Sequence, residues 1–199
     1  MFGLIVLVVI GLYLLISVGV VRWAIGYARK NGKNAKRWGW GAAFGMYLLV
    51  FWDWIPTVVA HKYYCSTEAG FWVYKTPEQW KKENPGVMET LVENKGAPST
   101  RQGKKGGFTD TYLLNHRINK IVKEYRASSV LPVYRLEQEV VDASNHRVLA
   151  RYLDFWTGYV DGWGDIKFWM TGNKHCNDGG AHRDVEFNEF KHQLLGSKK

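Results

Sequence analysis

Two long apolar runs and one short basic segment make up the first 60 residues. The first run, residues 2–21, contains no charged side chain. An α-helix of that length measures about 30 Å, which is the thickness of the hydrocarbon core of a bilayer. The second run, residues 38–60, is similarly apolar but carries Asp53 and Pro56 near its far end. The pattern predicts a hairpin of two transmembrane helices.

We expect the first run to stay in the mature protein. Only Met1 precedes it, and Arg22 and Trp23 follow it. A cleaved signal peptide would have a basic stretch in front and small residues at a cleavage site behind. The run is therefore interpreted as a membrane anchor.

The segment between the runs, residues 22–37, reads RWAIGYARKNGKNAKR and has six basic side chains and no acidic one. Short loops rich in Lys and Arg remain in the cytoplasm during membrane insertion. We therefore expect a cytoplasmic loop, with the amino terminus and residues 61–199 on the opposite side. In a Gram-negative bacterium that side is the periplasm.

Aromatic side chains flank the second run, and they predict where it meets the headgroups. Tryptophan is enriched at membrane interfaces, and Trp38, Trp52 and Trp54 are the expected anchors. Asp53 lies between two of them, so we expect an interfacial carboxylate that reaches water. A buried functional carboxylate is the alternative.

Gly41 and Gly45 stand four residues apart and predict a flat helix face. Such a face lets two membrane helices approach closely. We expect it to pack inside the hairpin. A seam between copies, or with a larger membrane complex, is the alternative.

After residue 60 the periodicity predicts an α+β domain with an antiparallel sheet and two or three helices. A capping box, Thr76 to Gln79 with Pro77 inside it, starts a short helix. Leu114, Ile118 and Ile121 recur at intervals of three and four, which predicts a helix from residue 109 or 110 to about 126. The remaining expected elements are strands at 70–75, 133–141, 147–156 and 166–171, a turn at 142–145, a long surface loop at 94–107, and a last helix from Asp184 with Phe187, Phe190 and Leu194 on one face.

Composition narrows the class of protein further. The chain has 199 residues and a net charge of +9, and its 10 Trp, 11 Tyr and 9 Phe exclude a disordered chain. Residues 1–60 supply +5 of that charge and residues 61–199 supply +4. Because the basicity is concentrated in the short loop, it is explained by topology, and we expect no nucleic-acid partner.

Cys65 and Cys176 are the two cysteines of the chain, and both lie in the exported part. Thiols on that side of a membrane usually form disulfides. A bridge that closes a loop of this length stabilises a fold by about 3 to 5 kcal/mol. We therefore predict a Cys65–Cys176 disulfide.

The histidines suggest a metal site as the alternative to a disulfide. His175, Asp178 and His182 lie close in sequence, and His61 precedes Cys65 by four residues. With reduced cysteines these residues could form a zinc site, but no cysteine pair has zinc-ribbon spacing. Residues 161–165 fail the calcium-loop pattern because Trp163 occupies the third position. The common catalytic motifs are absent, so no catalytic residue and no cofactor is predicted.

Trp163 stands between glycines in a predicted turn. An exposed indole there could stack on a sugar ring of an envelope glycan. Tryptophans in strands are more often part of the core. Trp163 is therefore a candidate stacking residue.

One stretch resembles a group of bacterial proteins with the same layout of two spans and an exported domain. The similar residues run from Tyr63 through Cys65, Trp72 and Trp80 to Val87, and the similarity continues at 140–142 and 149–152. The resemblance implies a bacterial inner-membrane protein. It implies no activity, ligand or site.

The expected function is binding. We expect a membrane-anchored periplasmic domain, without catalysis, that binds a protein partner or an envelope component such as a glycan. A membrane-tethered metal-dependent hydrolase that uses residues 175–182 is one alternative. An accessory subunit of a larger inner-membrane complex, or a homo-oligomer, is the other.

Overall fold

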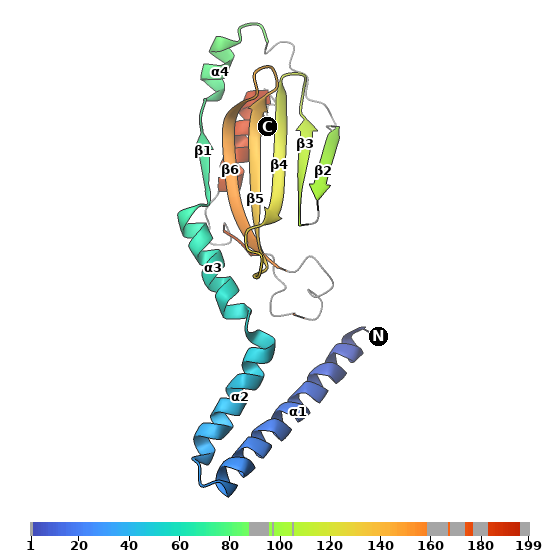
Figure 1. Cartoon of the computed structure of the whole chain (residues 1–199). Coiled ribbons are helices and arrows are strands. Elements are labelled where there is room, and N and C mark those ends of the chain that lie inside the picture. Colours follow the sequence, from blue (N-terminus) through green and yellow to red (C-terminus); the bar gives the residue numbers. More distant parts are fainter. Residues whose placement is uncertain are drawn as a thin grey trace.

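In the computed structural model, the first three helices lead from one end of an elongated molecule to an antiparallel sheet at the other end (Figure 1). The structure describes residues 2–87, 96, 98–104, 106–158, 167, 174–176 and 183–195. Within this part of the chain the fold is α+β, with five helices and a seven-stranded sheet.

The first two helices, α1 (Phe2–Lys30) and α2 (Ala35–Phe51), are joined by a four-residue turn. Asn34 caps α2, since its side chain accepts a hydrogen bond from the backbone N–H of Arg37 at 3.2 Å. The expected loop at 22–37 is therefore largely helical. Residues Leu7–Lys30 of α1 are long and apolar enough to cross a membrane.

The expected second span is not one straight helix. Helix α2 ends at Phe51 and α3 (Trp54–Thr67) begins after a break, with a bend of 54° between them. Pro56 explains why the helix restarts here, because proline has no N–H to donate to an earlier turn and is tolerated in the first turn of a helix. Together the two helices are apolar enough to form one broken span.

Close packing between α1 and α2 uses Gly39 instead of the predicted glycines. Ala24 and Ala28 of α1 are buried, and a Cβ on Gly39 would lie only 3.0 Å from the Ile25 side chain. A Cβ on Gly41 or Gly45 would meet nothing within 4 Å. The expected packing through Gly41 and Gly45 is therefore wrong, because the helix rotation places Gly39 at the contact.

The sheet has the order β1-β6-β5-β4-β3-β2, with β7 pairing beside β1 on β6. All of its pairs are antiparallel. The strands are β1 (Gly70–Val73), β2 (Ser99–Lys104), β3 (Gly107–Leu113), β4 (Ile118–Arg126), β5 (Val133–Asp142), β6 (Arg147–Thr157) and β7 (Lys174–His175).

The predicted helix at 109–126 is wrong. Residues 107–113 and 118–126 form strands β3 and β4, which pair with each other. Asn115 makes the turn between them, since its Oδ1 accepts from the N–H groups of Arg117 and Ile118 at 2.8 and 2.7 Å. An Asx turn of this kind lets a sequence with helical spacing reverse direction.

Several other predicted elements are confirmed. The hairpin of β5 and β6 and strand β1 form where expected, and α4 (Pro77–Glu83) has the complete capping box of Thr76 and Gln79. The expected loop at 94–107 is partly wrong because residues 99–104 are strand β2, whose ladder with β3 cannot be read from its composition. The expected strand at 166–171 lies outside the described residues, except Lys167.

Among the described residues, two hydrophobic clusters hold the domain together, one on each face of the sheet. Helix α6 (Arg183–Leu195) covers one face with Phe187, Phe190 and Leu194, as its spacing predicts. Helix α3 packs on the other face, where Tyr64 stacks on Phe155 with ring centroids 4.9 Å apart. The helix that follows the apolar segment is thus part of the domain core.

Candidate functional site

The junction between α3 and the sheet contains the disulfide. Strand β7 pairs with the end of β6, His175 opposite Trp156, and this places the next residue, Cys176, above α3. Cys176 is bonded to Cys65 with their Cα atoms 5.3 Å apart, 111 positions apart in sequence. The structure therefore contains the bridge that the sequence predicts.

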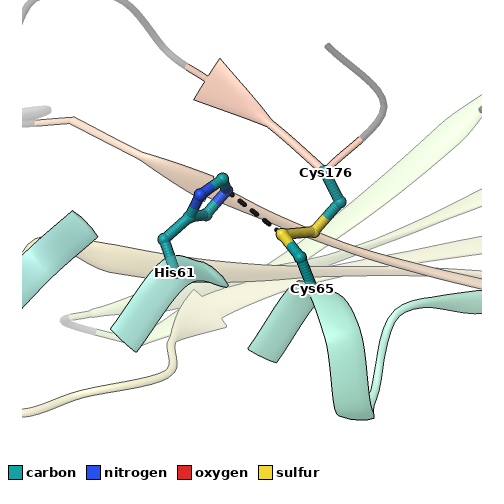
Figure 2. Close-up of side chains that lie close together, drawn as sticks. All are labelled: His61, Cys65 and Cys176. Carbon is teal, nitrogen blue, oxygen red and sulfur yellow. Dashed lines mark hydrogen bonds between the residues drawn. A yellow bond between two sulfur atoms is a disulfide. The ribbon is translucent and has the colours of Figure 1, made fainter. Parts of the chain in front are cut away.

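His61 lies one helical turn before Cys65 and faces the bridge (Figure 2). Its Nε2 atom is 3.4 Å from Cys65 Sγ and 3.1 Å from the carbonyl oxygen of Phe155. Since a carbonyl only accepts, Nε2 carries the proton and donates it to Phe155. His61, Cys65 and Cys176 each place a ligand-type atom within 4.8 Å of the others.

A second histidine, His175, makes a different site. Its Nδ1 donates to Asp154 Oδ2 at 2.5 Å, and the Cys176 N–H donates to Asp154 Oδ1 at 3.0 Å. Asp154 is almost fully buried. A buried carboxylate that orients an imidazole is a recurrent arrangement in enzymes that use histidine as a base.

The two histidines do not share a site. Asp154 and Phe155 are neighbours in β6, and successive strand side chains point to opposite faces of a sheet. His175 contacts the side chain of Asp154, whereas α3, which carries His61, packs against the ring of Phe155. Of the predicted metal ligands, His61 and His175 are therefore separated by the sheet, while Asp178 and His182 lie outside the described residues.

Further charged groups lie on the face with Asp154. Glu124 and Phe108 stand in the same row across the sheet, and Asp110 is in the next row. Burial raises the pKa of Glu124, and the charges of His175 and Arg101 act in the opposite direction. Arg101 holds Asp110 through two hydrogen bonds of 2.7 Å.

Sequence reasoning missed this row because its members come from separate strands. The sequence offers one signal of this row, since Asp154 is a charged residue between the apolar Leu153 and Phe155. Glu124 and Asp110 were assigned to the helix that does not form, so their alignment with Asp154 could not be predicted.

The structure also corrects the expected environment of Asp53, which lies at the break between α2 and α3. The expected interfacial carboxylate is fully buried, and it accepts a hydrogen bond from Lys167 Nζ at 2.5 Å. Thr57, one turn later, is also buried. The pair joins the helical end of the chain to a residue 114 positions later, which no local pattern indicates. Trp52 and Trp54 on either side are 47% and 41% exposed, and Trp38 is 40% exposed.

The face of the sheet that packs on α3 is open along its upper part. Trp72, Tyr74 and Tyr125 are 40%, 58% and 38% exposed there. Charged pairs lie between them, with both signs represented: Lys123–Glu139, Arg135–Glu68 and Arg151–Glu137. Trp163, the predicted stacking residue, lies outside the described residues.

These features define a class of protein: an α+β domain fixed by a disulfide to a helix that continues an apolar helical segment. Comparison with protein families, curated proteins and solved structures finds no significant match. Function must therefore be inferred from the geometry.

Proposed function

We propose that the chain is a membrane-anchored binding protein whose α+β domain lies in the periplasm of a bacterium and holds a protein partner. One observation carries the proposal. Helix α3 follows the apolar helix α2 directly, packs in the core of the domain, and is bonded to it through Cys65. The domain is thus held next to the membrane instead of hanging on a flexible linker.

The positions of the basic residues support this orientation of the chain in the membrane. In this proposal α1 forms one span and the broken pair α2 and α3 forms the second. The basic residues between residue 22 and residue 37 gather where α1 turns into α2. By the bias of Lys and Arg toward the cytoplasm, this turn faces the cytoplasm, and the sheet faces the opposite side.

The open sheet face supports a protein as the partner. Aromatic residues and Arg are enriched where proteins bind one another, and Trp72, Tyr74 and Arg151 lie together here. The guanidinium of Arg151 is held on this face by Glu137, whose carboxylate lies 2.6 Å from Arg151 Nη2. Charges of both signs suit a folded protein surface better than a polyanion.

Photo-crosslinking in living cells tests the proposal. A photoreactive amino acid at Tyr74 or Tyr125 should give one discrete adduct with an envelope protein, and the same amino acid at the exposed control position Val185 on α6 should not. Trp72→Ala should lower the yield from Tyr125 several-fold. Adducts of equal yield from Val185, or none from the sheet face, would contradict the proposal. An adduct with a glycan would contradict a protein partner and identify an envelope polymer as the ligand.

A hydrolase is the second candidate, and the Asp154–His175 pair is the observation that favours it. In the metal-dependent form of this hypothesis, His175 acts with residues up to His182. His175→Ala and Asp154→Asn would then abolish hydrolysis of a substrate while the fold is retained. Binding is placed first because the open sheet face presents exposed aromatic side chains and charged pairs to a partner.

An accessory role in a larger membrane complex is the third candidate. It rests on the exposed face of Gly41 and Gly45, which α1 does not cover. The mass of the detergent-solubilised protein separates a monomer from a homo-oligomer or a larger complex.

A further inference from the structure

The disulfide junction holds four donor atoms that converge from three elements. Two are the sulfurs of Cys65 on α3 and Cys176 after β7, and the third is Nε2 of His61 on α3 (Figure 2). The sulfurs and the imidazole nitrogen lie within 4.8 Å of one another. A tetrahedral Zn²⁺ with Zn–S of about 2.3 Å and Zn–N of about 2.0 Å needs donors roughly 3.5 to 3.8 Å apart. Small side-chain movements would supply that spacing.

The fourth atom is the carbonyl oxygen of Phe155. It lies 3.1 Å from His61 Nε2 and 3.6 Å from Cys176 Sγ. A carbonyl at this place is positioned to accept a hydrogen bond from a water molecule bound to a metal. The polar surroundings of such a site are therefore already assembled by the oxidised fold.

We propose that the reduced chain binds one soft divalent cation, Zn²⁺ by preference, through Cys65, Cys176 and His61. The disulfide and the metal are then alternative cross-links of the same junction. Two thiolates and an imidazole are a ligand set that zinc favours, and three protein ligands leave the fourth position to water. This inference is independent of the proposed binding function.

The chemistry has two steps. A phosphine reductant cleaves the S–S bond: the phosphine takes the oxygen atom of one water molecule and becomes the oxide, and the two protons of that water end on the two sulfurs. Zn²⁺ then displaces both thiol protons. His61 binds through Nε2, so its proton must lie on Nδ1 and its hydrogen bond to Phe155 is given up.

A cobalt titration of the full chain in detergent tests the proposal. Co²⁺ in a tetrahedral thiolate site gives a charge-transfer band and intense visible absorption. The reduced protein should bind one Co²⁺ with both signals, and Zn²⁺ should displace it. The oxidised protein should show neither signal.

Variants identify the ligands. Cys65→Ser and Cys176→Ser should abolish the charge-transfer band or cut it strongly. His61→Ala should weaken Zn²⁺ binding by more than about tenfold, since loss of even an outer hydrogen-bond partner costs about 10- to 100-fold. His116→Ala, at an exposed histidine between β3 and β4, is the matched control and should bind as the wild type does. No band in the reduced wild type, or equal affinity in His61→Ala, would overturn the proposal.

Circular dichroism shows whether reduction unfolds the domain, and in that case a second measurement tests the proposal. Zn²⁺ must then restore the native spectrum of the reduced wild type and fail to restore that of reduced His61→Ala at the same concentration. Failure to refold the wild type would also overturn the proposal.

Discussion

Asp142 is a buried carboxylate that joins three parts of the domain. It accepts hydrogen bonds from Trp80 Nε1 at 2.8 Å and from the Ser144 hydroxyl at 2.7 Å, and Arg117 Nη2 lies 3.4 Å away. Burial alone would raise the pKa of Asp142, but the hydrogen bonds from Ser144, Trp80 and Arg117 outweigh it and lower the pKa. The charged form is therefore the one that the fold stabilises.

Asp142→Asn should lower the free energy of unfolding by about 1 to 3 kcal/mol, because an amide cannot accept all of these hydrogen bonds. The pKa is lower in the folded state, so the contribution is complete above the unfolded pKa and is lost as the pH falls through the folded one. Acid should consequently destabilise the wild type more than the variant. Denaturant titrations at pH 7 and at acidic pH measure this, with the exposed Glu186→Gln as control. Equal stability of Asp142→Asn and the wild type at pH 7 would contradict it.

Lys120 is a half-buried cation under α6, with Nζ 5.7 Å from the centre of the Phe187 ring. Burial and the nearby charge of Lys191 lower its pKa to about 8. Because the unfolded chain then holds its proton more tightly, stability should rise with pH between about 8 and 10.5. Lys120→Met should remove this rise in melting temperature, and Lys191→Met should reduce it. If the melting temperature of Lys120→Met rises with pH as much as that of the wild type, the rise belongs to another group.

Individual contacts could be predicted where both partners are close in sequence. His61 and Cys65 are one helical turn apart, so their contact follows from the spacing once the helix is given. Asp154 and His175 meet through the pairing of β6 with β7, and Asp53 and Lys167 meet across 114 positions. Such long-range pairs depend on tertiary structure and leave no local pattern.

Elements were predictable where several local signals agree. The box of Thr76, Pro77 and Gln79 specifies α4, and the two-residue period specifies β5 and β6. At 109–126 the signals disagreed, because the helical spacing of Leu114 and Ile118 competes with β-branched residues and with the turn at Asn115. The ladders with β2 and β5 decide the outcome, and they are not visible in the segment itself.

The contact between α1 and α2 gives a prediction with its own control. Gly39→Leu should separate the two helices, because its Cβ already lies within 3.0 Å of Ile25. Overpacking typically costs about 1 to 3 kcal/mol. Gly41→Leu should leave the stability unchanged. The thermal stability of both variants in detergent measures this, and equal losses would show that the contact does not depend on Gly39.

At the scale of the molecule, the sequence predicts an apolar segment followed by an α+β domain. It does not predict how the two are connected. The connection depends on the bend between α2 and α3, on Tyr64 stacked on Phe155, and on Asp53 bound to Lys167. Helix α3 belongs to both parts. A boundary at residue 60 therefore marks where the hydropathy changes, but it does not mark where the packing of the domain begins.

The disulfide should contribute a large part of the stability of the domain. It joins residues 111 positions apart, and closing so long a loop removes many unfolded conformations, which is worth about 3 to 5 kcal/mol. Cys65→Ser should lower the free energy of unfolding by that amount, and the double variant with Cys176→Ser should lose no more. Alkylation of the unfolded, unreduced wild type should label neither cysteine. Full labelling would show that the bridge is absent.

Membrane orientation is the prediction on which the exported location depends. Residues 22–37 carry six basic side chains, and moving them across the membrane opposes both the insertion bias and the membrane potential. The carboxyl terminus should therefore be periplasmic. Alkaline phosphatase fused after Lys199 should be active, and a reporter that works only in the cytoplasm should be inactive there. Replacing Arg29, Lys30, Lys33, Lys36 and Arg37 with Gln should lower phosphatase activity, because the bias that holds the turn inside is removed. An active cytoplasmic reporter in the wild type would place the sheet among reduced thiols, where the metal-bound junction would be favoured over the disulfide.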